Sequence, residues 1–231
     1  APTNDDVGTH TITVTSTDAA GASASDSFDL TVDNTNDAPT VDSALADAST
    51  NEDAAYSATA SFADVDTGDT LTYSMSGAPS SLSIDSATGA ISGTPTNDDV
   101  GVHTITLTAT DVAGASASDS YDLTVVNTND APVVSSPIAD ASTDEDAAFS
   151  ATASFADVDV GDVLTYSMSG APTTLSIDSS TGAISGTPLN ADVGVHTITV
   201  TATDDGTGTM SGSDEFVLTV VNTNDAPTIS S

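Results

Sequence analysis

The feature that most constrains the fold is an internal repeat with a period of 93 residues. The segment Pro2–Gly8 (PTNDDVG) returns unchanged at Pro95–Gly101, and with two substitutions at Pro188–Gly194. Residues 58–110 and 151–203 are identical at 45 of 53 positions. Because a recurring segment of this length is large enough to hold a small core of its own, the fold to be explained is that of one unit.

The repeat also sets the domain boundaries. The tract Asn34–Pro39 (NTNDAP) recurs at Asn127–Pro132 and at Asn222–Pro227, where the interval is two residues longer. A short tract that contains Pro and no run of Gly or Ser indicates a linker between closely abutting units. We therefore expect four segments in a window of a longer tandem array: 1–37, the C-terminal part of a truncated repeat; 38–130 and 131–225, two complete repeats; and 226–231, the start of another.

Short alternating strands predict the fold class. In His103–Thr110, apolar residues and threonines alternate strictly, which is the pattern of a half-buried strand, and Ser120–Val126 alternates in the same way. The segment Asp85–Gly89 separates two further short apolar runs, as in a hairpin. About seven such strands in each unit, without a helical period, predict an all-β fold of tandem Ig-like or cadherin-like antiparallel β-sandwiches.

The charge balance excludes several classes of partner. The chain has no Lys and no Arg but 35 acidic residues, for a formal net charge of −35. Without basic side chains it cannot neutralise phosphates, so nucleic acids and anionic membrane surfaces are not expected partners. No apolar run is long enough for membrane insertion. The cations that balance these acids must come from outside the chain.

Part of the acidic side chains gathers where successive repeats should meet. Asn127–Asp130 ends one repeat, and the next contains Asp157 and Asp159 in one loop, Asp204 in another, and Glu145 near its start. Ca²⁺ prefers six to eight oxygen ligands from carboxylates, amides and main-chain carbonyls. These tracts supply such oxygens, and the short Asp side chain suits a site built from tight turns.

Four motifs together resemble one known family. They are NTNDAP, DVDxGDxLTYS, LSIDxxTGxISGTP and HTITxTATD, and they cover essentially the whole chain. In this combination they are similar to the cadherin-like repeats of the dystroglycan type, which are common in giant bacterial surface and secreted proteins. The resemblance implies Ca²⁺ ions at the junctions between repeats, as in classical cadherins, where such ions stiffen the rod.

The resemblance also implies a ligand set for each junction. The junction between the two complete repeats would use Glu52, Asp99, Asn127, Asn129, Asp130, Asp157, Asp159 and Asp204. The preceding one would use Asp6, Asn34, Asn36, Asp37, Asp64, Asp66 and Asp111. The last linker would use Asn222, Asn224 and Asp225, with Glu145 and Asp192 from the repeat before it. The linkers carry fewer carboxylates than the cadherin pattern, so we expect one or two ions per junction, with the weak affinity of extracellular modules.

Two other interpretations of the acids stay open. They can serve solubility alone, as in salt-adapted proteins, with the linker Asn and Asp residues forming turns. The segment Asp64–Asp69 is faintly similar to an EF-hand loop, but its Gly is misplaced and the closing Glu is absent.

The sequence contains no set of residues that indicates catalysis, and we expect no enzyme. The three histidines, His10, His103 and His196, occupy one equivalent position a whole repeat apart, which favours a role in packing or hydrogen bonding at the edge of a strand. The leading hypothesis is a structural spacer of a large exported bacterial adhesin, located outside the cell or on its surface and stiffened by Ca²⁺. The alternatives are a filament-forming extracellular subunit that assembles with copies of itself, or a module that binds a glycan or a protein.

Overall fold

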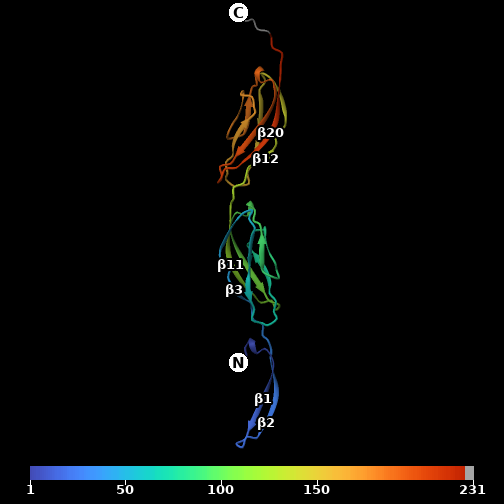
Figure 1. The fold of residues 1–231 in the computed structure, drawn as a ribbon, viewed down its shortest axis with the longest axis vertical. Helices are drawn as coiled ribbons and strands as arrows, with labels where there is room; N and C mark the ends of the chain where they lie inside the picture. Colours follow the sequence, from blue (N-terminus) through green and yellow to red (C-terminus); the bar gives the residue numbers. More distant parts are fainter. Residues whose placement is uncertain (227–231) are drawn as a thin grey trace. The chain divides into compact units, whose positions relative to one another are not determined.

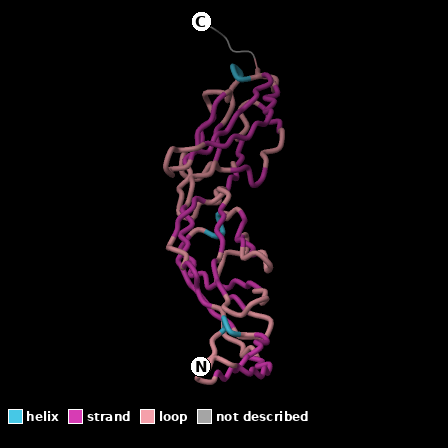
Figure 2. Tube along the Cα trace, turned by 60° about the horizontal axis from the view of Figure 1, so that its bottom comes forward, coloured by secondary structure: helices cyan, strands magenta, loops and turns pink. Residues whose placement is uncertain are grey.

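The computed structural model describes residues 1–226, so the predicted start of a further repeat lies outside the described residues except for Ala226. The chain divides into two compact units, Ala1–Val126 and Asn127–Ser231. Each unit has its own hydrophobic core. The helical segments among the described residues are three single-turn 3-10 helices (Figure 2). None of them has the length or apolar character needed to cross a membrane.

The first unit contains a hairpin followed by one complete repeat (Figure 1). In the repeat, one sheet has the strand order β4-β11-β10-β7, and the other strands form a three-stranded sheet, β5-β9-β8, and a pair, β3-β6. The elements of this unit are η1 (Asn4–Asp6), β1 (Gly8–Thr17), β2 (Ser23–Val32), β3 (Thr40–Ser43), β4 (Ala48–Asn51), β5 (Tyr56–Thr59), β6 (Ser61–Ala63), β7 (Thr72–Ser76), β8 (Leu82–Ile84), β9 (Ala90–Gly93), η2 (Asn97–Asp99), β10 (Gly101–Thr110) and β11 (Ser116–Val126).

The second unit repeats this topology. Its sheets have the orders β13-β20-β19-β16 and β14-β18-β17, with the pair β12-β15. Its elements are β12 (Val133–Ser136), β13 (Ala141–Asp144), β14 (Phe149–Thr152), β15 (Ser154–Ala156), β16 (Thr165–Ser169), β17 (Leu175–Ile177), β18 (Ala183–Gly186), η3 (Asn190–Asp192), β19 (Gly194–Thr203) and β20 (Ser211–Val221). Each repeat thus has nine strands, and its pairing is antiparallel except where β4 joins β11 and β13 joins β20 in parallel.

The alternating residues of β10 and β11 form the centre of the first repeat's core. Ile105 and Leu107 are at most 1% exposed, and Leu123 on β11 is completely buried. They pack against Leu82 and Ile91 of the facing three-stranded sheet. Because complete burial of one Leu or Ile side chain contributes about 1.5–3 kcal/mol to folding, this set is a main source of the repeat's stability.

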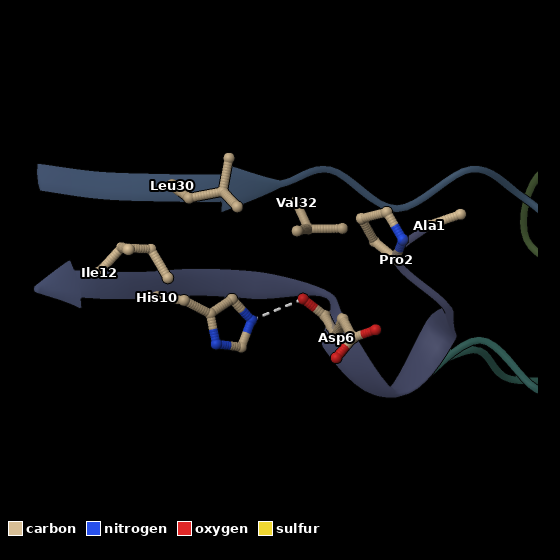
Figure 3. A pocket seen from close by; sticks show the side chains of 7 residues that line it. All are labelled: Ala1, Pro2, Asp6, His10, Ile12, Leu30 and Val32. Carbon is tan, nitrogen blue, oxygen red and sulfur yellow. Dashed lines mark hydrogen bonds between the residues drawn. The ribbon is translucent and has the colours of Figure 1, made fainter. Parts of the chain in front are cut away.

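The hairpin β1–β2 at residues 8–32 presents the same inner face, but no sheet formed by the described residues faces it. Phe28 and Val14 are 56% and 60% exposed, whereas their counterparts Tyr121 and Leu107 in the complete repeat are buried. Figure 3 shows part of this face, where a hollow of about 330 Å³ is lined by Ala1, Pro2, Asp6, His10, Ile12, Leu30 and Val32. The hollow therefore lies on the hairpin face that corresponds to the core-facing side of β10 and β11.

Candidate metal centre

Strand pairing brings three acidic segments together at one end of the first complete repeat. Thr40 at the start of β3 pairs with Ala63 at the end of β6, which places the linker before β3 beside the loop after β6. Thr72 at the start of β7 pairs with Thr110 at the end of β10, which places the end of that loop beside Asp111. The sheet register therefore gathers the predicted linker, Asp-x-Asp and late-strand ligands.

Hydrogen bonds join these segments directly. The main-chain N–H of Asp37 donates to Oδ2 of Asp66 at 2.7 Å. The side-chain amide of Asn36 donates to Oδ2 of Asp111 at 2.9 Å, and that of Asn4 donates to Oδ2 of Asp37 at the same distance. Three donors and three acceptors, from five residues, thus connect the linker with Asn4, Asp66 and Asp111.

Some carboxylate oxygens of this cluster are buried but accept no hydrogen bond from the described residues. Asp66 and Asp111 are 5% and 6% exposed. Oδ1 of Asp66 and Oδ2 of Asp64 are buried and have no hydrogen-bond partner among the described residues. One oxygen each of Asp64, Asp66 and Asp69 lies within 4.8 Å of the others. Since buried anionic oxygens are costly without a compensating charge and this chain has no Lys or Arg, the donor set fits a bound cation.

The pKa shifts within the cluster also favour a bound cation. Desolvation, followed by the charges of Asp64, Asp66 and Asp111, raises the pKa of Asp69. The hydrogen bond from Asn36 is the main cause that lowers the pKa of Asp111. The raised pKa of Asp69 thus reflects, besides desolvation, repulsion between neighbouring carboxylates, which a divalent cation would relieve.

The second unit builds the same cluster from equivalent residues. The main-chain N–H of Asp130 donates to Oδ2 of Asp159 at 2.6 Å, and the amide of Asn129 donates to Oδ2 of Asp204 at 3.1 Å. Oxygens of Asp157, Asp159 and Asp162 lie within 4.8 Å of one another. The structure therefore brings together the linker, Asp-x-Asp and late-strand residues that the sequence predicted for the start of each complete repeat.

The predicted early Glu contacts the linker that follows its own repeat. Glu145 is 2% exposed, and its Oε1 accepts a 2.7 Å hydrogen bond from the N–H of Thr223. Its Oε2 is buried without a hydrogen-bond partner among the described residues. In the same linker, the amides of Asn222 and Asn224 donate to the carbonyls of Thr223 and Asp225. Glu52, the equivalent residue of the first unit, is also 2% exposed.

The remaining predicted ligands have local roles. Asp6, Asp99 and Asp192 each end a 3-10 turn, and each carboxylate accepts the N–H of the residue three positions earlier, at 2.9–3.0 Å. This hydrogen bond is the largest cause that lowers the pKa of all three. Asn34 and Asn127, at the first linker position, are exposed.

The histidines belong to these turns. Nε2 of His10, His103 and His196 donates to the carbonyl oxygen of Asp6, Asp99 and Asp192, respectively, at 2.6–2.7 Å, and Figure 3 shows the first of these bonds. A hydrogen bond repeated in all three copies fits the predicted role at the edge of a strand.

Sequence reasoning missed Asp69 and Asp162 as members of the clusters. Both belong to the quoted motif DVDxGDxLTYS, so the signal was present. The motif alone did not reveal that Gly68 and Gly161, with φ of +97° and +108°, are the turn residues directly before these two carboxylates.

Comparison with known proteins identifies the domain family of the repeats. The family described as "Putative Ig domain" (He_PIG) matches residues 38–126 and 131–221. Over 135 residues, the chain is 38% identical to the "Serine-rich adhesin for platelets" of Staphylococcus aureus strain MRSA252. That stretch is 58% of this chain and 10% of the adhesin, so the chain spans about a tenth of the length of this relative.

Solved structures extend the likeness to nearly the whole chain. Mouse cadherin-23 EC22-24 aligns with a TM-score of 0.55 and 23% identity, over 93% of this chain and 74% of that one. PcdhgB3 EC1-4 aligns with a TM-score of 0.57 and 18% identity, over 96% and 59%. At these identities the likeness shows the fold alone, and it confirms the predicted all-β tandem sandwiches. Since its family match covers both complete repeats, this chain belongs to the He_PIG family of Ig domains.

Proposed function

We propose that this chain is a spacer segment of a large exported bacterial adhesin-type repeat protein, in which Ca²⁺ bound at the linkers stiffens the array. The observation that carries the proposal is a set of buried carboxylate oxygens beside the linkers that have no hydrogen-bond partner in residues 1–226, in a chain that lacks Lys and Arg. The similarity to a staphylococcal adhesin supports a location outside the cell or on its surface.

The ligands are assigned from the clusters and from the cadherin-like motifs. At the linker 34–37 the ion would be held by Asn36, Asp37, Asp64, Asp66, Asp69 and Asp111; at the linker 127–130 by Asn129, Asp130, Asp157, Asp159, Asp162 and Asp204. Glu52 and Asp99, and Glu145 and Asp192, are the ligands that the motifs assign to the repeat before a linker. The same motifs lead us to place the repeats in the dystroglycan-type subclass.

The ion supplies positive charge and a centre of oxygen coordination. Without it, the carboxylates of a linker repel one another, and that repulsion is relieved when the linker swings away from the repeat that follows. With it, the linker main chain is held to the Asp-x-Asp loop through the bond from Asp37 to Asp66, and to the late-strand loop through Asn36 and Asp111. Binding therefore converts a hinge into a fixed connection.

Small-angle scattering and thermal unfolding, each with EDTA and with Ca²⁺, test this function. We expect about 1–5 mM Ca²⁺ to narrow the distribution of molecular dimensions and to raise the unfolding temperature. The double variant Asp66→Asn with Asp159→Asn should lose both responses. Identical scattering and identical unfolding temperatures in EDTA and in Ca²⁺ would contradict the proposal.

One observation favours a second candidate, assembly with copies of the same chain. The inner face of the hairpin β1–β2 exposes Ile12, Val14, Phe28 and Leu30 by 37–60%, and exposed apolar faces of this kind promote association. Sedimentation velocity over a range of protein concentrations tests it. A concentration-independent monomer would exclude the filament, and it would leave the spacer proposal intact.

A further inference from the structure

The two linkers with complete acidic clusters differ in the loop that follows the long strand. In the first repeat, the loop from Asp111 to Ala115 closes with the N–H of Asp111 bonded to the carbonyl of Ala115 at 3.0 Å. In the second repeat, the equivalent bond at 3.1 Å runs from Asp204 to Met210, so the loop is two residues longer. The flanking strands keep the same register, Thr110 with Ser116 and Thr203 with Ser211.

The longer loop lies against the acidic cluster. Gly206 approaches so closely that a Cβ atom at this position would overlap Oδ1 of Asn129 and would lie 2.6 Å from Oδ2 of Asp162. In the shorter loop, the residue two positions after Asp111 is Ala113, which has a side chain and is exposed. The space beside the linker amide is therefore covered by the main chain in the second unit and open in the first.

The longer loop also adds a charge and an attachment. Asp205 takes the position that Val112 has in the first repeat. Oδ1 of Asp205 accepts the N–H of Val163 at 2.8 Å, which ties the loop to the chain directly after Asp162. The cluster at the linker 127–130, called the covered cluster below, thus has one carboxylate more than the open cluster at the linker 34–37.

The covered cluster has acceptor oxygens to spare. Oδ2 of Asp157 and Oδ2 of Asp162 are buried and accept no hydrogen bond from the described residues. Asp159 and its equivalent in the first unit, Asp66, are both 5% exposed. In the first unit, Oδ1 of Asp66 is buried without a hydrogen-bond partner among the described residues. Gly206 has no positive φ, so only the lack of space, not its backbone conformation, accounts for a residue without a side chain here.

We propose that the loop Asp204–Met210 is a fixed cover over the divalent-cation site at the linker 127–130, so that this site releases its ion more slowly than the open site at the linker 34–37. The inference rests on the proposed function, because it assumes that both clusters hold Ca²⁺. An ion under the cover leaves only when the loop moves, and the Asp205 carboxylate adds attraction. An additional carboxylate near a divalent ion strengthens its binding by about tenfold, even with the screening of water.

Stopped-flow mixing of the Ca²⁺-loaded chain with a fluorescent chelator measures the release. We expect two phases whose rates differ by about tenfold or more. Asp66→Asn should remove the fast phase, since it alters the open site only. Gly206→Ala should remove the slow phase or accelerate it to the rate of the fast one. Thr207→Ala, at an exposed position of the same loop, is the matched control and should leave both phases unchanged.

A loop transplant guards against a folding defect of Gly206→Ala. Replacing residues 205–209 with the Val-Ala-Gly segment of residues 112–114 installs a loop that the first repeat already accommodates. The transplant should release all its Ca²⁺ at the fast rate. A slow phase that survives both Gly206→Ala and the transplant, or a wild-type chain with one phase, would overturn the cover. Absence of any Ca²⁺ release from the wild-type chain would instead contradict the proposed function.

Discussion

At the scale of single residues, Asp66 makes two opposing contributions to stability. Its carboxylate accepts the linker N–H of Asp37, which favours the folded state. Its other oxygen is buried without a hydrogen-bond partner among the described residues and lies near the carboxylates of Asp64 and Asp69, which disfavours it. The sign of its net contribution therefore depends on whether a cation is present.

Asp66→Asn is expected to change the unfolding temperature in opposite directions with and without Ca²⁺. Asn keeps an oxygen that can accept the N–H of Asp37 but removes the negative charge. In EDTA the unfolding temperature of the variant should lie a few degrees above that of wild type, because residue 66 no longer repels the carboxylates of Asp64 and Asp69. In millimolar Ca²⁺ it should unfold below wild type by about 4–8 °C, which corresponds to about 1 kcal/mol for a domain of this size. Calorimetry in the two buffers measures both shifts.

The control is Asp98→Ala. Asp98 is exposed and directly precedes Asp99 in η2, and the equivalent residue of the next repeat is Ala191, so the fold accepts Ala there. It removes the same unit of charge and should show no reversal between EDTA and Ca²⁺. Equal shifts for Asp66→Asn and Asp98→Ala in Ca²⁺ would mean that only net charge matters.

Asp85 should contribute to the stability of the folded state in a way that depends on pH but not on a metal ion. Its carboxylate accepts the N–H groups of Ala87 and Thr88 at 2.9 and 2.8 Å. The bond from Thr88 is the largest cause that lowers the pKa of Asp85 below 3.8, followed by that from Ala87. A lowered pKa in the folded state stabilises it above pH 3.8, and the stabilisation is lost as the pH falls through the folded-state pKa.

At pH 7, Asp85→Ala is therefore expected to unfold at a lower denaturant concentration than wild type. Well below pH 3.8, the two proteins should unfold at the same denaturant concentration. Denaturant titrations across this range give the comparison, and Asp178→Ala should repeat the result in the second unit, where Asp178 has the same hydrogen bonds and the same direction of pKa shift. A deficit that persists unchanged in acid would assign the loss to the turn geometry and not to the charge.

At the scale of elements, the sequence predicted the long strands better than the short ones. The strict alternation of residues 103–110 identified the buried face of β10 because eight residues give four repeats of the pattern. β3 and β4 have four residues each, too few to show a clear period, and so the nine strands of a repeat were predicted as about seven. The parallel pairing of β4 with β11 depends on contacts distant in sequence, which no local pattern reveals.

The candidate metal site was also predicted only in part from the sequence. Linker, Asp-x-Asp and late-strand residues were found because they stand in quoted motifs, and strand register then explains their proximity. Asp69 and Asp162 were missed, since their membership depends on a turn at the preceding Gly that carries the chain back toward Asp64 and Asp157. The cover by Gly206 could not be predicted either, because a two-residue insertion in a loop has many conformations.

Gly77 provides a test of how tightly β7 packs on β10. Its φ is +75°, and a Cβ atom there would overlap the carbonyl oxygen of Thr104. Gly77→Ala should therefore destabilise the first repeat by about 2 kcal/mol or more, from backbone strain and displacement of β10 together. Hydrogen exchange should show faster exchange of β10 amides, whereas β19 in the second unit, which has its own core, should be unaffected.

The matched control is Gly114→Ala. Gly114 has a similar φ of +95°, but its Cβ position is open. It should show the cost of the backbone conformation alone, about 1–2 kcal/mol. If both variants lose the same stability, the close approach to Thr104 contributes nothing.

At the scale of the whole molecule, the negative charge is a property of each repeat. Of the 35 acidic residues, 7 lie in residues 1–37, 14 in 38–130 and 14 in 131–225. An array with this charge and no basic side chain repels itself along its whole length, and dissolved salt screens that repulsion with a Debye length of about 10 Å at 0.1 M. Screening and site binding both stabilise such a chain, but they differ in the concentration and in the ion that they require.

Comparing NaCl, Mg²⁺ and Ca²⁺ separates the two. NaCl should raise the unfolding temperature gradually up to about 1 M, because screening increases with ionic strength. Mg²⁺ at the same ionic strength should give little more than this, since it demands octahedral geometry and gives up its water reluctantly. Ca²⁺ accepts irregular sets of carboxylate and amide oxygens, so it should produce its full effect in the low millimolar range. If Mg²⁺ and Ca²⁺ gave the same curve, the acids would serve solubility alone, and the clusters beside Asp66 and Asp159 would be turns and not metal sites.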